Sequence, residues 1–328
     1  MTIQFGFIGF RHSHIFDMYQ RCLEHEEIDV VAGCEEHGPT RDVLAKAGQV
    51  QVTDEKFDNI LDRCDVIAVG DCYGLRAERI IRALEHGKHV ISDKPICISQ
   101  DELTQIKSAA VEAGRVVGCM LDMRDLPVYL GLRDAIRSGA IGDVHAISFD
   151  GQHPLLYGKR PGWYFETGMH GGVLNDISVH AIDFVPWATG LQIESIVAAR
   201  EWNATLPEHP DFRQCGQAMF TLENGAGVIC DVSYLTPDSF AYEFPFYWRF
   251  TIWGADGVLE AGVNSTAIQL FRNGEREVTD LPLPDARPGA YLESFLQEIG
   301  GQKDGLHLSS DDVFRASETA LQLQQAAQ

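Results

Sequence analysis

Two carboxylates and an imidazole recur at helical intervals in one apolar stretch of the chain, GGVLNDISVHAIDF (171–184). Asp176 and His180 are four residues apart, and Asp183 follows three residues later. On an α-helix these intervals place side chains on one face, and the apolar neighbours predict that the helix is buried. Because unpaired buried charge is costly, we expect an acid–base site here. A satisfied core histidine would fit the same pattern, and the sequence leaves both explanations open.

A lysine follows the apolar run KHVIS (88–92), within the tripeptide Asp93-Lys94-Pro95. If the run is a parallel strand, Lys94 lies at the carboxyl edge of the sheet, where ligands bind. Proline fixes the chain direction after the lysine. An ammonium group at that edge can polarise a substrate oxygen and favour its alkoxide.

A predicted first strand leads directly into GFRHSHI (9–15). A dinucleotide-binding loop would read GxGxxG here, and only Gly9 fits, because Arg11 and His14 occupy the positions of the second and third glycines. The loop still lies between a strand and a helix, where Arg11 and His12 would help the helix N-terminus to hold a pyrophosphate. An ordinary strand-to-helix turn is the other explanation.

An acidic pair, Glu35-Glu36, follows the apolar run DVVAGC (29–34). An acidic side chain at a strand tip accepts hydrogen bonds from the adenosine ribose hydroxyls, and it repels a 2′-phosphate. His37 follows, with no adjacent Arg or Lys, so the sequence favours NAD over NADP. A solvated acidic loop would explain the same residues.

Short apolar runs alternate with amphipathic stretches over the first 120 residues. The runs lack polar alternation, as parallel strands covered on both faces do. We predict strands at 3–8, 29–34, 65–70, 88–92 and 115–120. We predict helices at 14–26, 74–86 and 99–114, the last with a capping box at Ser99 and Glu102. This alternation predicts an N-terminal Rossmann domain with a doubly wound parallel sheet, over residues 1–122.

The pattern changes after residue 122, and residues 123–328 predict an α+β domain with a large, mostly antiparallel open sheet and helices on one face. Asn224-Gly225 and Asn273-Gly274 are typical of tight hairpin turns. We predict strands at 143–151, 192–202, 213–222, 226–234, 247–253, 257–261, 266–272 and 275–281. We predict further helices at 126–138, 289–299 and 310–326.

Composition limits the class of protein. A length of 328 residues favours two domains. The formal net charge of −22 argues against binding to nucleic acid or to an anionic membrane surface. We find no signal peptide and no apolar run of membrane-spanning length, and the eight cysteines form no CxxC pair, so we expect a cytoplasmic protein with free, buried thiols.

These motifs together resemble the Gfo/Idh/MocA oxidoreductases, and the resemblance covers almost the whole chain. It rests on Gly9, Glu35, Asp93-Lys94-Pro95, and Gly171-Gly172 followed by Asp176 and His180. The signatures of that family are an EKP tripeptide and a GGGxxxDxxxH helix. Asp93 is a conservative variant of the first, and His170 stands where the first glycine of the second usually lies. Asp71-Cys72-Tyr73 and Arg76 also depart from the usual residues, which indicates a divergent branch.

The resemblance implies a nicotinamide-dependent enzyme that transfers a hydride to or from a sugar, polyol or related ring compound. It implies that His180 is the general base or acid, that Asp176 binds substrate hydroxyls, and that Lys94 contacts the nicotinamide ribose and the substrate. We predict cofactor contacts at Gly9, Phe10, Arg11, His12, Glu35, Asp71, Cys72, Lys94 and Pro95. We predict substrate contacts at Arg124, Trp163, Tyr164, His170 and Asp176, although the aromatic residues would serve equally well as packing residues.

Alternatives remain open. The same residues would serve an NAD-dependent glycosidase, lyase or epimerase that oxidises its substrate transiently, and a dinucleotide-sensing regulator would use the same fold without catalysis. Asp176, His180 and Asp183, with His170, have spacing that would suit a metal, but hydride transfer needs none and we predict no metal. Apolar segments such as 226–235 and 247–253 would leave one sheet face uncovered, so we expect a homodimer or homotetramer.

Overall fold

The computed structural model describes residues 2–328, and the chain divides into two compact units. Each unit is assembled from segments that are far apart in the sequence. The first contains the chain up to Leu121, Gly168–Gly171 and Gly289–Glu318. The second contains Asp122–Thr167, Gly172–Pro288 and Thr319–Gln328.

The sheet of the first unit has five parallel strands in the order β2-β1-β3-β4-β5. Their bounds are β1 Ile3–Ile8, β2 Ile28–Cys34, β3 Val66–Val69, β4 His89–Asp93 and β5 Val117–Met120. β3 and β5 are apolar and buried throughout, and the carboxyl-terminal halves of β1, β2 and β4 are buried as well, which agrees with their lack of polar alternation. The strand order reverses between β1 and β3, so the predicted doubly wound Rossmann-like sheet is confirmed.

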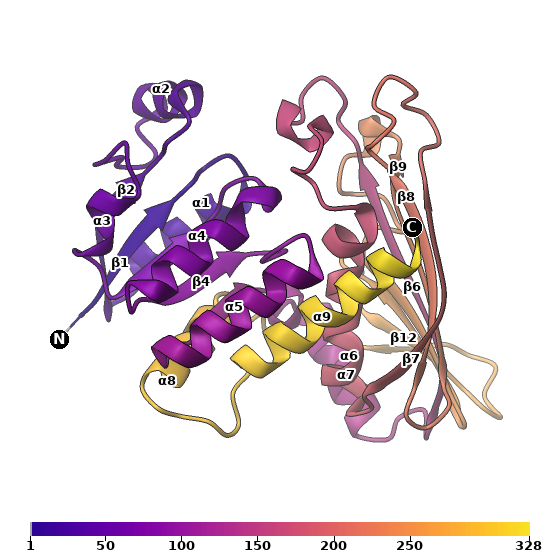
Figure 1. Cartoon of the computed structure of the whole chain (residues 1–328). Helices are drawn as coiled ribbons and strands as arrows, with labels where there is room; N and C mark the ends of the chain where they lie inside the picture. Colours follow the sequence, from indigo (N-terminus) through magenta and orange to yellow (C-terminus); the bar gives the residue numbers. More distant parts are fainter. Residues whose placement is uncertain (1) are drawn as a thin grey trace. The chain divides into compact units, whose positions relative to one another are not determined.

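Helices cover both faces of this sheet (Figure 1). They are α1 His14–Glu24, α2 Gly38–Ala47, α3 Asp58–Leu61, α4 Tyr73–Glu85, α5 Gln100–Ala113 and α8 Ala290–Ile299. Connections between parallel strands are right-handed. Because the chain crosses the sheet in one direction from β1 to β2 and in the other from β3 to β5, α1 lies on the opposite face from α4 and α5. At the start of α5 the Ser99 hydroxyl accepts a hydrogen bond from the Glu102 amide, and the Glu102 carboxylate accepts one from the Ile98 amide.

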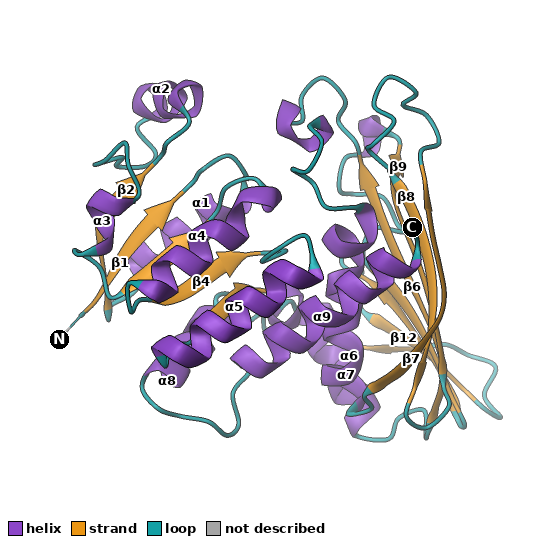
Figure 2. Cartoon of the chain, viewed as in Figure 1, coloured by secondary structure: helices purple, strands orange, loops and turns teal. Residues whose placement is uncertain are grey.

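The second unit contains an eight-stranded sheet in the order β13-β12-β11-β10-β6-β9-β8-β7, drawn in Figure 2 as long orange strands. Every neighbouring pair is antiparallel except β6 and β9, so the predicted mostly antiparallel sheet is confirmed. The bounds are β6 Val144–Pro154, β7 Ile193–Trp202, β8 Cys215–Leu222, β9 Gly227–Thr236, β10 Arg249–Gly254, β11 Gly257–Gly262, β12 Ile268–Arg272 and β13 Thr279–Leu281. The last strand is shorter than the predicted 275–281.

Helices of the second unit pack on one face of its sheet (Figure 1). They include α6 Pro127–Arg137 and α7 Val179–Thr189, and Phe184 of α7 contacts Phe250 of β10 with ring centroids 4.4 Å apart. α9 Ser310–Ala326 begins in the first unit and ends in the second. Side chains that point to the opposite face of the sheet, among them Met219, Ile229 and Trp253, are exposed. No helix within residues 2–328 is both long and apolar enough to span a membrane.

Candidate functional site

The carboxyl ends of β1 and β3 approach each other too closely for any side chain but hydrogen. Gly9 has a φ of +79°, and a Cβ atom there would lie 2.5 Å from the Cβ of Asp71. A Cβ on Gly70 would lie 2.3 Å from the Gly9 carbonyl oxygen. Glycine at these positions therefore lets two backbones meet where the strand order reverses, which is where doubly wound sheets bind their ligands.

The loop after Gly9 leads into α1, and no side chain caps the N-terminus of this helix. Amide groups at an uncapped helix N-terminus, together with the helix dipole, attract an anion. The close glycine turn and the helix that follows it thus fit the pyrophosphate of a dinucleotide, although the second and third glycines of the usual motif are absent.

An ion-pair network around the buried Asp71 lies beside this loop. The Asp71 carboxylate accepts hydrogen bonds from Arg11 Nε at 2.6 Å, Arg79 Nε at 2.7 Å and the Cys72 amide at 2.8 Å. Burial by itself raises the pKa of Asp71, but Arg11 and Arg79 outweigh it and hold that pKa below its ordinary value. Arg11 is therefore anchored to Asp71, which fixes the loop and keeps a guanidinium group beside it.

Glu35 lies directly after β2 and is buried. Its carboxylate accepts hydrogen bonds from the amides of Phe10 at 2.7 Å and His37 at 2.8 Å. Burial raises the pKa of Glu35, and these two amides oppose that effect. The side chain thus joins the tip of β2 to the loop after β1.

Lys94 lies immediately after β4, between two residues that a single arginine anchors. Arg76 of α4 is fully buried and donates to Asp93 Oδ2 at 2.7 Å and to the Pro95 carbonyl at 2.9 Å. It also donates to the Gly70 carbonyl at 2.8 Å. Arg76 therefore ties both neighbours of Lys94 to the end of β3, Asp93 through its carboxylate and Pro95 through its backbone carbonyl.

Asp93 is the centre of a second hydrogen-bonded cluster. It accepts a short hydrogen bond from Nδ1 of His12, and Nδ1 of His14 lies 3.2 Å from its other oxygen. Nε2 of His12 lies 3.1 Å from the Tyr73 hydroxyl. Burial lowers the pKa of His12 to about 4, so its ring is neutral near pH 7. Burial by itself raises the pKa of Asp93, but Arg76 and the two histidines bring it well below its ordinary value.

The ligand atoms of His12, His14 and Asp93 lie within 4.8 Å of one another, a spacing that a metal site would also have. The negative charge of Asp93 is already balanced by Arg76, and both ring nitrogens of His12 already have hydrogen-bonding partners. We therefore assign these residues to hydrogen bonding that supports the segment around Lys94.

In the second unit, Asp176 and His180 lie on a continuous helical segment but not on a uniform α-helix. Residues Leu174–Ser178 form a π-helical turn, and α7 begins only at Val179. The prediction of one α-helix from the glycines onward is therefore wrong for this turn. Single π-helical turns are rare and occur frequently at functional sites.

Asp176 and His180 are both buried, and each lies beside an aromatic side chain, Tyr234 of β9 and Trp248 of the loop before β10. The Tyr234 hydroxyl of β9 donates a short hydrogen bond to Asp176 Oδ2. Burial, and then the charge of Asp176, raises the pKa of Tyr234 well above its ordinary value, so this phenol remains a donor. The His180 ring lies 4.5 Å from the ring of Trp248, at an interplanar angle of 68°.

Asp183, the third polar residue of the segment, has a different partner. Arg124 donates to both of its oxygens, with Nε at 2.8 Å and Nη2 at 2.6 Å, and both side chains are buried. This bidentate pair joins the short helix Asp122–Asp125 to α7. The geometry therefore gives Asp183 a supporting role, and it engages Arg124, a predicted substrate contact, within the protein.

The remaining predicted substrate contacts fall in two groups. Trp163 and Tyr164 are buried in the second unit, with ring centroids 4.1 Å apart, and the Arg160 guanidinium lies 4.7 Å from the Tyr164 ring. His170 belongs to the first unit, where its ring lies 5.6 Å from the Tyr73 ring.

Tyr73, Arg76, Tyr234 and Trp248 were not predicted as site residues. Tyr73 and Arg76 stand where the sequence departs from the family pattern, and that departure was the signal that could have singled them out. Tyr234 and Trp248 are more than fifty residues from Asp176 and His180, in a strand and a loop that carry no motif, so spacing could not associate them.

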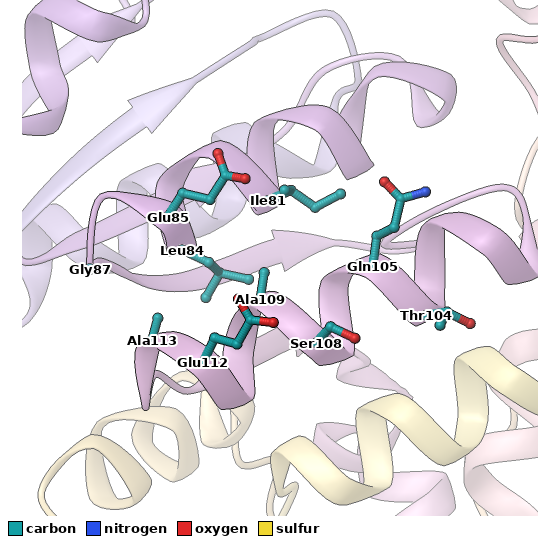
Figure 3. A pocket seen from close by; sticks show the side chains of 10 residues that line it. All are labelled: Ile81, Leu84, Glu85, Gly87, Thr104, Gln105, Ser108, Ala109, Glu112 and Ala113. Atoms are coloured by element: carbon teal, nitrogen blue, oxygen red, sulfur yellow. The ribbon is translucent and has the colours of Figure 1, made fainter.

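A surface groove lies elsewhere, between α4 and α5 (Figure 3). Its lining contains two acidic side chains, Glu85 and Glu112, and neither histidine nor lysine. The residues that line it are Ile81, Leu84, Glu85, Gly87, Thr104, Gln105, Ser108, Ala109, Glu112 and Ala113. It includes none of the predicted catalytic or cofactor-binding residues.

Two family matches cover most of the chain. Residues 3–120 match the oxidoreductase family with an NAD-binding Rossmann fold, GFO/IDH/MocA. Residues 129–260 match the GFO/IDH/MocA C-terminal domain. The two matches follow each other in the order expected for one protein of this family.

Curated relatives match over part of their length. A 1,5-anhydro-D-fructose reductase from Ensifer adhaerens is 34% identical over 36% of this chain and 36% of its own. A levoglucosan dehydrogenase from Pseudarthrobacter phenanthrenivorans is 27% identical over 58% of this chain and 52% of its own. The alignments thus span between about a third and just over half of these relatives.

Solved structures show the same fold over the full length. An inositol dehydrogenase homolog from Azotobacter vinelandii, complexed with NAD+, has a TM-score of 0.82 at 15% identity and covers 100% of this chain and 95% of its own. An aldose-aldose oxidoreductase from Caulobacter crescentus has a TM-score of 0.80 at 19% identity and covers 100% and 98%. At these identities the likeness establishes the fold.

The buried pair of Arg124 and Asp183 gives a prediction about stability. Replacing Asp183 with Asn leaves a buried guanidinium without its counter-charge, so we expect a loss of about 3–5 kcal/mol in the free energy of unfolding. Urea denaturation measures it. Asp17→Asn, which breaks the exposed pair with Arg21, is the control and should cost less than about 1 kcal/mol. Equal effects of the two substitutions would contradict the assignment.

Proposed function

Because the chain belongs to the Gfo/Idh/MocA family of oxidoreductases, we propose that it transfers a hydride between NAD(H) and a hydroxyl-bearing or keto carbon of a sugar, polyol or related ring compound. The names of two curated relatives, a 1,5-anhydro-D-fructose reductase and a levoglucosan dehydrogenase, support this substrate class. The direct test is a spectrophotometric screen for NADH formation across aldoses, inositols, sugar acids and anhydrosugars.

The observation that carries the proposal is the buried pair of Asp176 and His180, four residues apart on one helical segment. His180 takes the proton from the substrate hydroxyl during oxidation and returns it during reduction. Asp176 orients the substrate by accepting from its hydroxyls. The Tyr234 hydroxyl donates to Asp176 Oδ2 and so holds the carboxylate in one orientation. Asp176 Oδ1 then accepts from the substrate in a fixed direction.

Lys94 has an electrostatic role in the proposed reaction. Its ammonium group favours the alkoxide form of the substrate oxygen and contacts the nicotinamide ribose. Arg76 anchors Asp93 and Pro95 on either side of it, which supports a fixed position for the lysine. The bound nicotinamide supplies the hydride acceptor, and the protein supplies orientation and charge.

The loop from Gly9 to His12 holds the pyrophosphate in this proposal, together with the N-terminus of α1. Phe10 and Arg11 belong to that loop, and Asp71 and Cys72 border it from the end of β3. Glu35 accepts from the adenosine ribose hydroxyls. A carboxylate accepts about four hydrogen bonds, so the two amides that it binds leave capacity for the ribose.

We expect the protein to prefer NAD(H) over NADP(H). The Glu35 carboxylate would repel a 2′-phosphate, and burial strengthens that repulsion by excluding water. Fluorescence titrations of the protein with NADH and NADPH measure the two dissociation constants. Tighter binding of NADPH would show that Glu35 does not face the ribose.

His180→Ala should reduce turnover about a hundred- to ten-thousand-fold, because removal of a general base typically has this effect. NADH affinity should change by only a few-fold. His145→Ala, which removes an exposed histidine of β6, is the control and should retain normal turnover. A correctly folded His180→Ala protein with near-normal turnover would refute the catalytic role. Lys94→Ala, in contrast, should lose turnover and also weaken NADH binding.

We also propose that the protein forms homodimers or homotetramers through the open face of its eight-stranded sheet. Met219 of β8 and Ile229 of β9 expose apolar surface on adjacent strands, and Trp253 does so on β10, with β6 between β9 and β10. Exposed apolar surface on one face of a sheet marks an interface between protein molecules. Light scattering at micromolar concentration should give a multiple of 36.4 kDa, and Ile229→Lys should shift it towards the monomer. A wild-type mass of 36.4 kDa would contradict the proposal.

A further inference from the structure

The loop between β9 and β10 is unusually rich in aromatic residues. Six of the eleven residues in DSFAYEFPFYW (238–248) are aromatic, and the run contains no Leu, Ile, Val or Met. Phe240, Tyr242 and Phe246 are 53%, 43% and 42% exposed. A group of exposed aromatic side chains marks a surface that binds something, because water solvates it poorly.

The last residue of this loop has a strained backbone. Trp248 has a φ of +51°, a region that bulky side chains rarely adopt. Its carbonyl accepts a hydrogen bond of 2.5 Å from the hydroxyl of the buried Tyr129, and its ring stacks on Phe149. Strain of this kind persists where the surrounding structure enforces it, and it is concentrated at ligand sites. The surrounding structure therefore holds the Trp248 indole in a defined position.

That position makes Trp248 the inner member of a row of rings. The row begins at His180, whose ring lies 4.5 Å from Trp248. Tyr247 follows at 5.3 Å from Trp248, and Tyr242 at 5.3 Å from Tyr247. The rings thus lead from the buried His180 to the exposed Tyr242 without leaving the second unit.

His153 of β6 supports the row from the side. Its ring lies 4.5 Å from Trp248, 4.8 Å from Tyr247 and 6.4 Å from Tyr242, with interplanar angles between 80° and 87°. Because His153 meets all three rings edge-on, it fixes the orientation of each of them. The row is therefore held in place before any ligand arrives.

The chemistry of the row favours a ring-shaped ligand with hydroxyl groups. Flat aromatic faces stack on the apolar face of a sugar or on an aryl ring, and phenol hydroxyls at the rim hydrogen-bond to polar substituents. Aliphatic side chains, which a protein partner would need for close packing, are almost absent from the run. The connection of the row to His180 ties the ligand to the proposed catalytic site.

We propose that Trp248, Tyr247 and Tyr242 form a subsite for a second ring of the substrate, attached through a glycosidic bond to the ring that is oxidised. This inference rests on the proposed function and makes it more specific. Glycosides with an aryl or glycosyl group are then better ligands than the corresponding small alkyl glycosides, because the row contacts the group beyond the glycosidic oxygen.

Matched pairs of ligands test the subsite. Binding of methyl and phenyl glycosides of glucose, galactose and mannose, as both anomers, is measured by tryptophan fluorescence of the full-length protein in the presence and absence of NADH. For at least one sugar we expect the phenyl glycoside to bind about three- to tenfold more tightly, as one stacking contact provides. Tyr242→Ala should remove this advantage. Tyr157→Ala, which removes another exposed tyrosine of the second unit, is the matched control and should retain it.

Three outcomes would overturn the inference: no phenyl preference for any sugar, including a failure of every glycoside to bind; a preference that survives Tyr242→Ala; or a change of molar mass in that variant, which would make the loop a contact between copies. NADH formation from free monosaccharides without any phenyl preference would refute the subsite alone. A phenyl preference in binding with no NADH formed from any glycoside would refute the proposed function and leave the subsite intact.

Discussion

A fully buried arginine holds together the strand ends on which the first unit's candidate site depends. Arg76 donates to the Gly70 carbonyl after β3 and to Asp93 and Pro95 at the end of β4. A buried guanidinium is tolerated only where such acceptors compensate for its lost hydration. Because Arg76 needs these hydrogen-bond acceptors, it fixes the path of the chain around Lys94. The Asp93 carboxylate also holds His12 and His14 of the loop after β1.

Local patterns predicted most of the secondary structure. The strand at 3–8 and the helix at 310–326 have the predicted bounds, because apolar runs and helical periodicity are strong there. All eight cysteines are free and buried, as expected. α2 and α3 were not predicted. The first opens with Gly38-Pro39 and buries only Leu44, and the second has four residues, so neither has a visible apolar period.

The candidate site was predictable only in part, for a similar reason. Spacing singled out Asp176 and His180, and a strand end singled out Lys94, because these signals lie within a few residues of chain. The partner of each residue lies far away in sequence. The fold brings Tyr234 of β9 and Trp248 of the following loop to the helical segment. Helical spacing alone did not reveal that Asp183 would pair with Arg124.

The first unit is built from segments that are far apart in the sequence, and this constrains how the chain can fold during synthesis. The parallel sheet ends at β5, yet Phe295 of α8 packs against Gly118 of that strand, and α8 is translated long after it. When the first 121 residues have emerged from the ribosome, the edge strand β5 therefore still lacks α8, the helix that packs against it. That apolar surface stays accessible to chaperones until the C-terminal segment emerges, so the first unit, although it begins the chain, is among the last parts to be completed.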